Sequence, residues 1–138
     1  MAYRVSSTYL ENRVLGASPL ELVTILYEEA AKSVREAAAA VRSGDIRGRS
    51  REITRAQLIL GELSASLNPE AGGELAIRLN DLYSYMQRRL TEAHVQQSVA
   101  PLEEVGRLLA ILAEGWQRCA TNEANARPAA SSEMLSTV

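Results

Sequence analysis

The chain has 138 residues, of which 46% are hydrophobic, and a formal net charge of −2 at pH 7. This length and apolar content predict one compact domain with a sizeable core. The weakly acidic balance excludes the broad basic surface that nucleic acid or an anionic membrane would require. No run approaches the ~20 apolar residues of a membrane span, and residues 1–15 carry scattered charges instead of an apolar signal core. We therefore expect a cytosolic protein with no membrane insertion and no nucleic-acid partner.

The first 16 residues form a distinct N-terminal segment. Its apolar side chains are spaced too irregularly for a strong helix but are too many for a solvated tail: Tyr3, Val5, Tyr9, Val14 and Leu15. We predict that residues 1–16 lie against the rest of the fold, either as a displaceable cover of an apolar groove or as a fixed fifth element of the core.

A first helix begins after Ser18. The run Ser18-Pro19-Leu20-Glu21 combines an N-cap hydroxyl, a proline at the first helical position and a glutamate three residues after the cap. Gly44 supplies a left-handed stop. The apolar positions between them follow the i, i+3, i+4, i+7 pattern of one buried face: Val23, Leu26, Tyr27, Ala30, Val34, Ala37, Ala38 and Val41.

Three more helices follow after short turns. Asp45 can cap the second helix, which ends at Asn68-Pro69. Gly72-Gly73 forms a corner before the third helix, and Pro101 fits the first turn of the fourth. Their apolar stripes are Ile53, Ala56, Leu60, Leu63 and Leu67 in the second; Leu75, Leu79, Leu82, Tyr83, Met86, Leu90 and Ala93 in the third; and Leu102, Val105, Leu109, Leu112, Trp116 and Cys119 in the fourth.

Short connections make successive helices antiparallel neighbours. The sequence therefore predicts an all-α fold, an antiparallel up-down four-helix bundle within a single domain over residues 1–122. Residues 123–138 are rich in Ala, Ser and Asn and lack periodicity, so we predict a disordered tail there.

Patterns that would indicate catalysis or metal binding are sparse. A single histidine, His94, without a Glu-x-x-His pair cannot build a di-metal carboxylate centre. Gly72-Gly73 lacks the lysine and spacing of a phosphate-binding loop, and the single Cys119 fits a small core residue in a reducing compartment. Phosphotransfer through His94 is the enzyme alternative, but a polar residue near a helix end is the better reading. We expect no enzyme activity, no cofactor and no metal.

Arginine and tyrosine give the remaining signals. The one basic cluster is Arg47, Arg49, Arg51 and Arg55. It has no interleaved aromatic residue for base stacking, which favours a solvated helix face over an RNA site. The adjacent Arg88 and Arg89 either include one partner of a carboxylate on another helix or are both exposed with buried stems. Tyr27 and Tyr83 lie on apolar stripes and are expected in the core. For Tyr9 and Tyr85 we expect surface roles, because tyrosine suits grooves that are sometimes covered.

Several blocks of residues together resemble one family. They are Tyr9, Asn12 and Val14; Ala17-Ser18-Pro19, Glu21-Leu22-Val23 and Leu26-Tyr27; Gly44-Asp45-Ile46; Gly72-Gly73-Glu74-Leu75-Ala76; Leu79, Leu82-Tyr83, Tyr85-Met86, Arg88-Arg89-Leu90 and Glu92-Ala93; and Leu102, Glu104-Val105, Leu108-Leu109, Leu112 and Trp116. In this order they resemble the flagellar secretion chaperone FliS family from about Tyr9 to Trp116.

The resemblance implies a non-enzymatic chaperone. It would bind the disordered C-terminal segment of flagellin one-to-one as a monomer, prevent premature polymerisation and assist delivery to the flagellar type III export apparatus. An export-gate component is a second candidate partner. The residues expected to bind flagellin or to take part in capping its groove are Tyr9, Asn12, Val14, Leu22, Leu26, Tyr27, Tyr83, Tyr85, Met86, Arg89, Leu90, Ala93 and Trp116. The alternative is a helical adaptor or regulator that binds another amphipathic segment of the export system.

Overall fold

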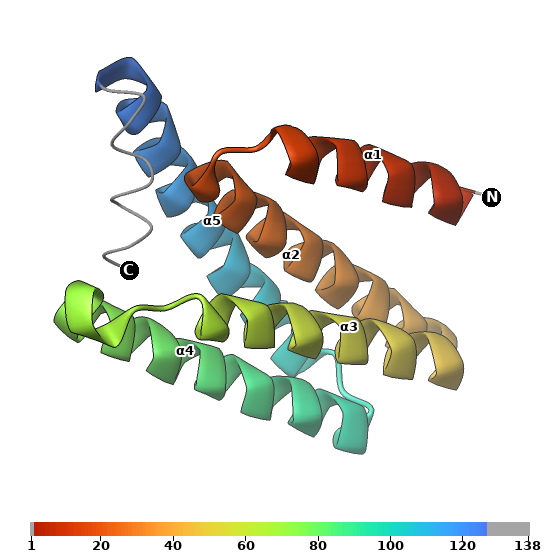
Figure 1. Cartoon of the computed structure of the whole chain (residues 1–138). Coiled ribbons are helices and arrows are strands. Elements are labelled where there is room, and N and C mark those ends of the chain that lie inside the picture. Colours follow the sequence, from red (N-terminus) through yellow and green to blue (C-terminus); the bar gives the residue numbers. More distant parts are fainter. Residues whose placement is uncertain (1, 127–138) are drawn as a thin grey trace.

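A computed structural model describes residues 2–126, and within them every element is a helix (Figure 1). The helices are α1 (Ala2–Gly16), α2 (Pro19–Ser43), α3 (Ile46–Ala65), α4 (Pro69–Gln96) and α5 (Ala100–Ala126). In the bundle, α2 packs against α3 and α5, and α4 packs against the same two helices. The predicted all-α bundle of antiparallel helices is therefore confirmed.

The first two helix boundaries follow from capping. The Ser18 hydroxyl accepts a hydrogen bond from the Glu21 amide at 3.2 Å and donates to the Glu21 carboxylate at 3.1 Å. Gly44 ends α2 with a left-handed φ of 74°, which a residue without Cβ adopts at little cost. Asp45 then caps α3, because its Oδ1 accepts from the Gly48 amide at 2.9 Å. The chain thus reverses direction within two residues, and α2 and α3 become antiparallel neighbours.

The corner predicted at Gly72-Gly73 lies inside α4. Asn68 caps the helix by accepting from the Ala71 amide at 3.3 Å, and Pro69 occupies its first turn. Gly73 then breaks the helical geometry with φ 54° and ψ −129°. The helix therefore begins before the kink rather than after it.

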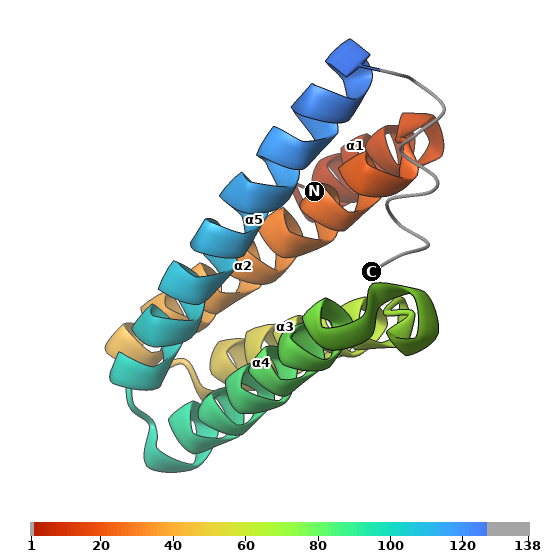
Figure 2. The same cartoon turned by 90° about the vertical axis from the view of Figure 1, so that its left-hand side faces the viewer.

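A single apolar core joins α2, α3, α4 and α5. Its fully buried members include Leu20, Tyr27, Val34, Leu60, Leu63, Met86, Leu90, Leu102, Val105 and Leu109. The predicted stripes are confirmed for most positions, with two corrections. Leu75 is 53% exposed and Ala76 is buried in its place, because the buried face of α4 begins after the kink at Gly73 and continues from Ala76 to Leu79 and Tyr83 at spacings of three and four residues. Toward this end α4 and α5 diverge (Figure 2). Cys119 is only half-buried, since it lies two turns from the end of α5.

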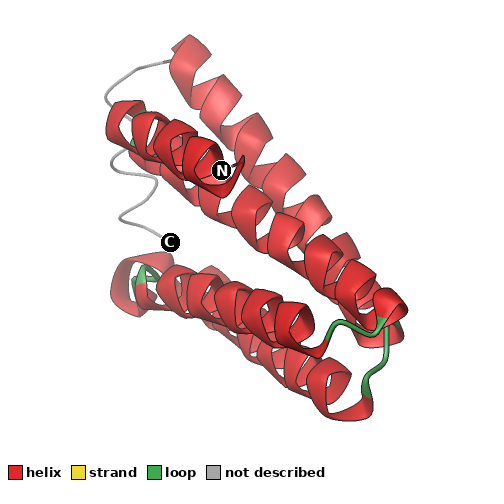
Figure 3. Ribbon diagram, turned by 90° about the vertical axis from the view of Figure 1, so that its right-hand side faces the viewer, coloured by secondary structure: helices red, strands yellow, loops and turns green. Residues whose placement is uncertain are grey.

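The N-terminal segment is a helix, contrary to the prediction of weak helical order. Figure 3 shows α1, which carries the N-terminus, on the outside of the bundle. Near the end of α1, Arg13 pairs with Glu28 of α2 at 3.3 Å. Ile25 lies one turn before Glu28 on the same face of α2 and is only 4% exposed, although it is not part of the core cluster. Ile25 is therefore buried close to the point where Arg13 joins α1 to α2. Tyr9 and Leu15 of α1 remain exposed.

The C-terminal boundary also differs from the prediction. The helix α5 continues to Ala126, four residues into the range predicted as a disordered tail. The remainder of that range, residues 127–138, lies outside the described residues.

Candidate functional site

The structure distributes the predicted site residues over three environments. Six of them are buried in the core: Tyr27, Tyr83, Met86, Leu90, Ala93 and Trp116. Four are half-buried: Leu22, Leu26, Tyr85 and Arg89. Three are exposed on α1: Tyr9, Asn12 and Val14. A partner can touch the last two groups on the folded bundle, whereas the buried group can act only through the packing of the helices.

Three buried aromatic residues form one hydrogen-bonded chain. The Trp116 indole nitrogen donates to the Tyr27 hydroxyl at 3.0 Å, and the hydroxyls of Tyr27 and Tyr83 are hydrogen-bonded to each other. The ring centroid of Tyr27 lies 6.5 Å from the ring centroid of Trp116 and 6.3 Å from that of Tyr83. Burial raises the pKa of both tyrosines, so the hydroxyls stay neutral and keep their protons for donation. These three hydrogen-bonded side chains connect α2, α4 and α5 across the core. The prediction that Tyr27 and Tyr83 are core residues is confirmed.

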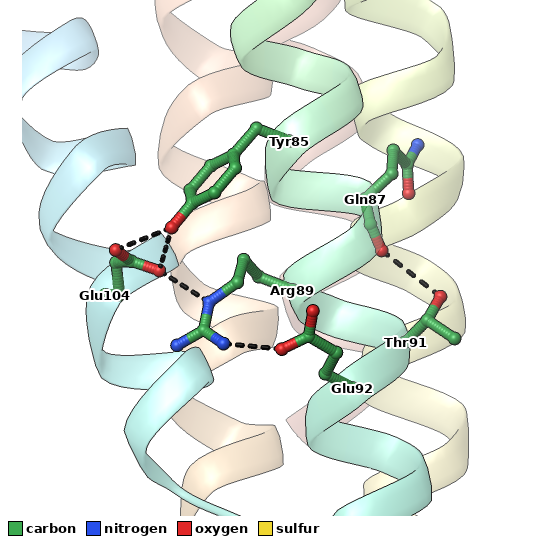
Figure 4. Close-up of polar contacts among 6 residues, drawn as sticks. All are labelled: Tyr85, Gln87, Arg89, Thr91, Glu92 and Glu104. Atoms are coloured by element: carbon green, nitrogen blue, oxygen red, sulfur yellow. Dashed lines mark hydrogen bonds and ion pairs between the residues drawn. The ribbon is translucent and has the colours of Figure 1, made fainter.

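A second cluster lies between α4 and α5 near the surface (Figure 4). The Tyr85 hydroxyl donates to both oxygens of Glu104, at 2.8 and 2.9 Å. Arg89 donates from Nε to Glu104 at 2.6 Å and from Nη1 to Glu92 at 2.5 Å. Beside it, the Thr91 hydroxyl donates back to the Gln87 carbonyl at 3.2 Å, a bond within α4.

The groups in this cluster stabilise one another's charge states. The Tyr85 hydroxyl and the Arg89 guanidinium lower the pKa of Glu104, and the same contacts raise the pKa of Tyr85 and of Arg89. Of the two alternatives for the adjacent arginines, the structure shows the first, because Arg89 pairs with a carboxylate on another helix. Arg88 is exposed, with its guanidinium carbon 6.0 Å from the centroid of the Tyr85 ring.

Apolar side chains continue from this cluster along both helices. On α5, Leu108 and Ile111 follow Glu104 at four and seven residues and so lie on the same face. On α4, Leu82 precedes Tyr85 by three residues. Leu82 and Leu108 are half-buried and Ile111 is 66% exposed, because α4 and α5 diverge away from the cluster (Figures 1 and 2). We call this surface the α4–α5 face: Leu82, Tyr85, Arg89, Glu104, Leu108 and Ile111.

The basic cluster predicted on α3 is only partly a solvated face. Arg49 is buried, and its Nε donates to His94 Nδ1 of α4 at 3.4 Å. Arg55 pairs with Glu29 of α2 at 2.8 Å. Arg47 and Arg51 are exposed as predicted. Two of the four arginines therefore bind neighbouring helices instead of facing solvent, which a one-dimensional charge pattern does not reveal.

Two classes of site are not found in the part of the chain that the structure describes. Within residues 2–126, no three of the His, Cys, Asp and Glu side chains are grouped so that they could hold a metal ion. No helix in the same range is long and apolar enough to cross a membrane.

Comparison with known proteins identifies the family. The model of the family described as "Flagellar protein FliS" matches residues 1–123. The chain belongs to the FliS family. The flagellar secretion chaperone FliS of Salmonella typhimurium is 34% identical over 110 residues, which cover 79% of this chain and 82% of the relative. FliS of Bacillus subtilis is 31% identical over 117 residues, covering 85% and 86%, and FliSB of Pseudomonas aeruginosa is 35% identical over 107 residues, covering 78% and 85%. The FliS family consists of flagellar secretion chaperones and not of enzymes.

Both hydrogen-bonded clusters connect blocks of residues that carry the FliS resemblance. Tyr27, Tyr83 and Trp116 come from three separate blocks. Arg89 and Glu104 come from two. Four residues of the α4–α5 face are not among the predicted site residues: Leu82, Glu104, Leu108 and Ile111. The sequence shows that Leu108 and Ile111 follow Glu104 at four and seven residues. It does not show that α4 lies beside this face of α5.

Proposed function

We propose that this chain is a cytoplasmic chaperone specific for flagellin, which binds the C-terminal segment of flagellin, prevents its premature polymerisation and assists its delivery to the flagellar export apparatus. Membership of the FliS family, whose relatives are named flagellar secretion chaperones, supports the secretion role. The observation that carries the binding role is the α4–α5 face, where apolar side chains remain exposed next to a fixed cluster of polar groups.

The chemistry of this face suits an amphipathic segment. Exposed and half-buried side chains such as Ile111 and Leu108 supply apolar contact, which drives most of the association of a helix with a groove. Tyr85, Arg89 and Glu104 are held by one another, so they present hydrogen-bonding groups without further loss of rotamer freedom. Ordering a disordered segment costs free energy, so a binding partner must cover on the order of 1,000–3,000 Å². A bundle of this size provides such an area for one bound segment, and we therefore propose a monomer that binds flagellin one-to-one.

The alternative function is a helical adaptor or regulator that binds a different amphipathic segment, such as one from an export-gate component. The same face would serve that partner. Only the identity of the captured segment separates the two functions.

A capture experiment with two forms of flagellin tests the proposal. The immobilised chain should retain the full-length flagellin of its host and should lose flagellin that lacks its C-terminal segment. Ile111→Asp should weaken capture, because it places a charge on the apolar part of the α4–α5 face. Leu58→Asp is the matched control, since Leu58 is 67% exposed and lies on α3, outside this face. Equal retention of both flagellins would favour the adaptor alternative.

A further inference from the structure

Two oppositely charged side chains are buried on the same face of α3 without pairing with each other. Arg49 and Glu52 are each only 8% exposed, and they lie three positions apart. The Arg49 Nε donates to His94 Nδ1 of α4 at 3.4 Å, and within residues 2–126 Arg49 forms no ion pair. A buried charge without an opposite charge bound to it costs free energy, so a guanidinium held only by a neutral ring is unusual at this depth.

Glu52 has one oxygen that is bonded and one that is free. Its Oε2 accepts from the Nε of the exposed Arg51 at 3.2 Å. Its Oε1 is the one buried side-chain nitrogen or oxygen in the described part of the chain that lacks a hydrogen-bond partner. Buried carboxylate oxygens normally accept hydrogen bonds. The free oxygen is therefore within one helical turn of Arg49, whose guanidinium carries the donors that it lacks.

The hydrogen bond from Arg49 to His94 requires a neutral imidazole. Nδ1 accepts only while it keeps its lone pair, so the ring proton is on Nε2. Protonation of Nδ1 would remove the acceptor and would place a second cation 3.4 Å from the guanidinium nitrogen. Histidine is the side chain whose charge ordinarily changes between about pH 5 and pH 8. The contact is therefore of a kind that a proton can break.

Within residues 2–126, Arg49 is the only charged group bonded to His94. The carboxylates nearest to this part of α4 are already bound elsewhere, because Glu92 of α4 and Glu104 of α5 both pair with Arg89. Neutral polar side chains of α3 line the cavity of about 170 Å³ beside the ring: Ser50, Thr54 and Gln57. His94 therefore has no carboxylate within ion-pair distance that would stabilise an imidazolium.

We propose that Arg49 is a proton-dependent switch with two positions. Beside neutral His94 it joins α3 to the last turn of α4, as the structure shows. When His94 takes up a proton, the guanidinium moves to the free oxygen of Glu52 and forms an ion pair within α3. The last turn of α4 then loses this bond to α3, and the hydrogen bond from Gln57 to Thr91 remains one turn earlier on α4. The switch concerns the packing of α3 on α4 in the free chain, so it does not depend on the proposed function.

Proton NMR of the His94 ring between pH 5 and pH 8 tests the switch, because His94 is the only histidine in the chain. Glu52→Gln weakens the second position of Arg49, so the midpoint of the His94 titration should fall by about half a pH unit or more. When Arg49→Gln is also present, Glu52→Gln should have little effect, because no guanidinium is left to move. Glu62→Gln is the matched control, since Glu62 is exposed on α3 ten residues after Glu52.

An unchanged midpoint in Glu52→Gln would overturn the proposal. An equal fall with and without Arg49 would also overturn it, because the charge of Glu52 would then act on His94 directly. A second measurement needs no variant and decides even if Arg49→Gln does not fold. In the ¹³C-labelled wild type, the Glu52 carboxyl signal should change at the midpoint of the His94 titration, and a signal that does not follow His94 would contradict the switch.

Discussion

Trp116 and Tyr27 are 89 positions apart in the chain, yet the indole nitrogen donates to the tyrosine hydroxyl at 3.0 Å in the core of the bundle. The same hydroxyl is bonded to that of Tyr83. A buried polar chain of this kind strengthens one arrangement of the helices, because any other packing would leave donors and acceptors unpaired. It therefore stabilises the position of α5, the helix that contributes Glu104, Leu108 and Ile111 to the α4–α5 face.

Tyr27→Phe should destabilise the bundle. The substitution leaves the Trp116 N–H and the Tyr83 hydroxyl without their buried partner, and we expect the free energy of unfolding to fall by about 1–3 kcal/mol. Urea denaturation followed by fluorescence measures the change, since Trp116 is the only tryptophan. Tyr85→Phe is the control: its hydroxyl lies near the surface, where water can replace it, so its effect should be smaller. Equal losses for the two variants would contradict the role assigned to the buried chain.

Stability should depend on the ionisation of Glu104. Tyr85, Arg89 and Arg107 hold its pKa below the ordinary value of 4.5. A carboxyl group whose pKa is lower in the folded state stabilises the fold fully above its unfolded pKa, and that contribution is lost as the pH falls through the folded pKa. The difference in melting temperature between the wild type and Glu104→Gln should therefore be largest near neutral pH and should shrink below about pH 4.5. A difference that stays constant down to the acid end would show that the ionised carboxylate contributes nothing.

Removal of α1 should expose apolar surface without unfolding the bundle. Deleting the residues before Ala17 frees Glu28 from Arg13, and we expect it to uncover Ile25, which is only 4% exposed and lies one turn before Glu28 on α2. We expect stronger binding of an apolar dye with unchanged cooperative unfolding. The single variant Arg13→Ala breaks the ion pair but leaves the rest of α1 in the chain, so it should change dye binding less. Unchanged dye binding on deletion would rule out a covering role for α1.

The kink in α4 should require glycine at position 73. Gly73 has φ 54° and ψ −129°, a conformation that other residues adopt only with strain, so Gly73→Ala should cost about 1–3 kcal/mol of stability. Gly61 is an ordinary helical glycine of α3 with open space around it, and Gly61→Ala should stabilise by up to about 1 kcal/mol. Thermal unfolding of the two variants should therefore shift in opposite directions. A shift in the same direction would mean that the kink carries no strain for alanine.

The local features of the fold were predictable from the sequence, because capping and periodicity act over a few residues. Ser18 and Gly44 marked the ends of α2, and the stripe through Tyr83 and Leu90 marked the buried face of α4. What depended on neighbouring helices was not predictable. Leu75 continues the stripe in sequence, yet the surrounding helices bury the neighbouring Ala76 instead.

The site was harder to predict than the fold for the same reason. The sequence shows a tyrosine at both positions 83 and 85. Only the structure distinguishes the buried Tyr83 from the half-buried Tyr85. Arg49 reads as part of a solvated charge run until α4 is placed beside α3.

Isothermal titration of the wild-type chain with the last ~40 residues of its host's flagellin, paired with circular dichroism of the mixture, tests the central claim most directly. Binding by the proposed mechanism orders a disordered segment on the α4–α5 face, so we predict saturation at one peptide per chain and more helicity in the mixture than in the separate components. Absence of binding at both low and moderate salt, with the bundle still folded, would contradict the chaperone function and leave the adaptor alternative.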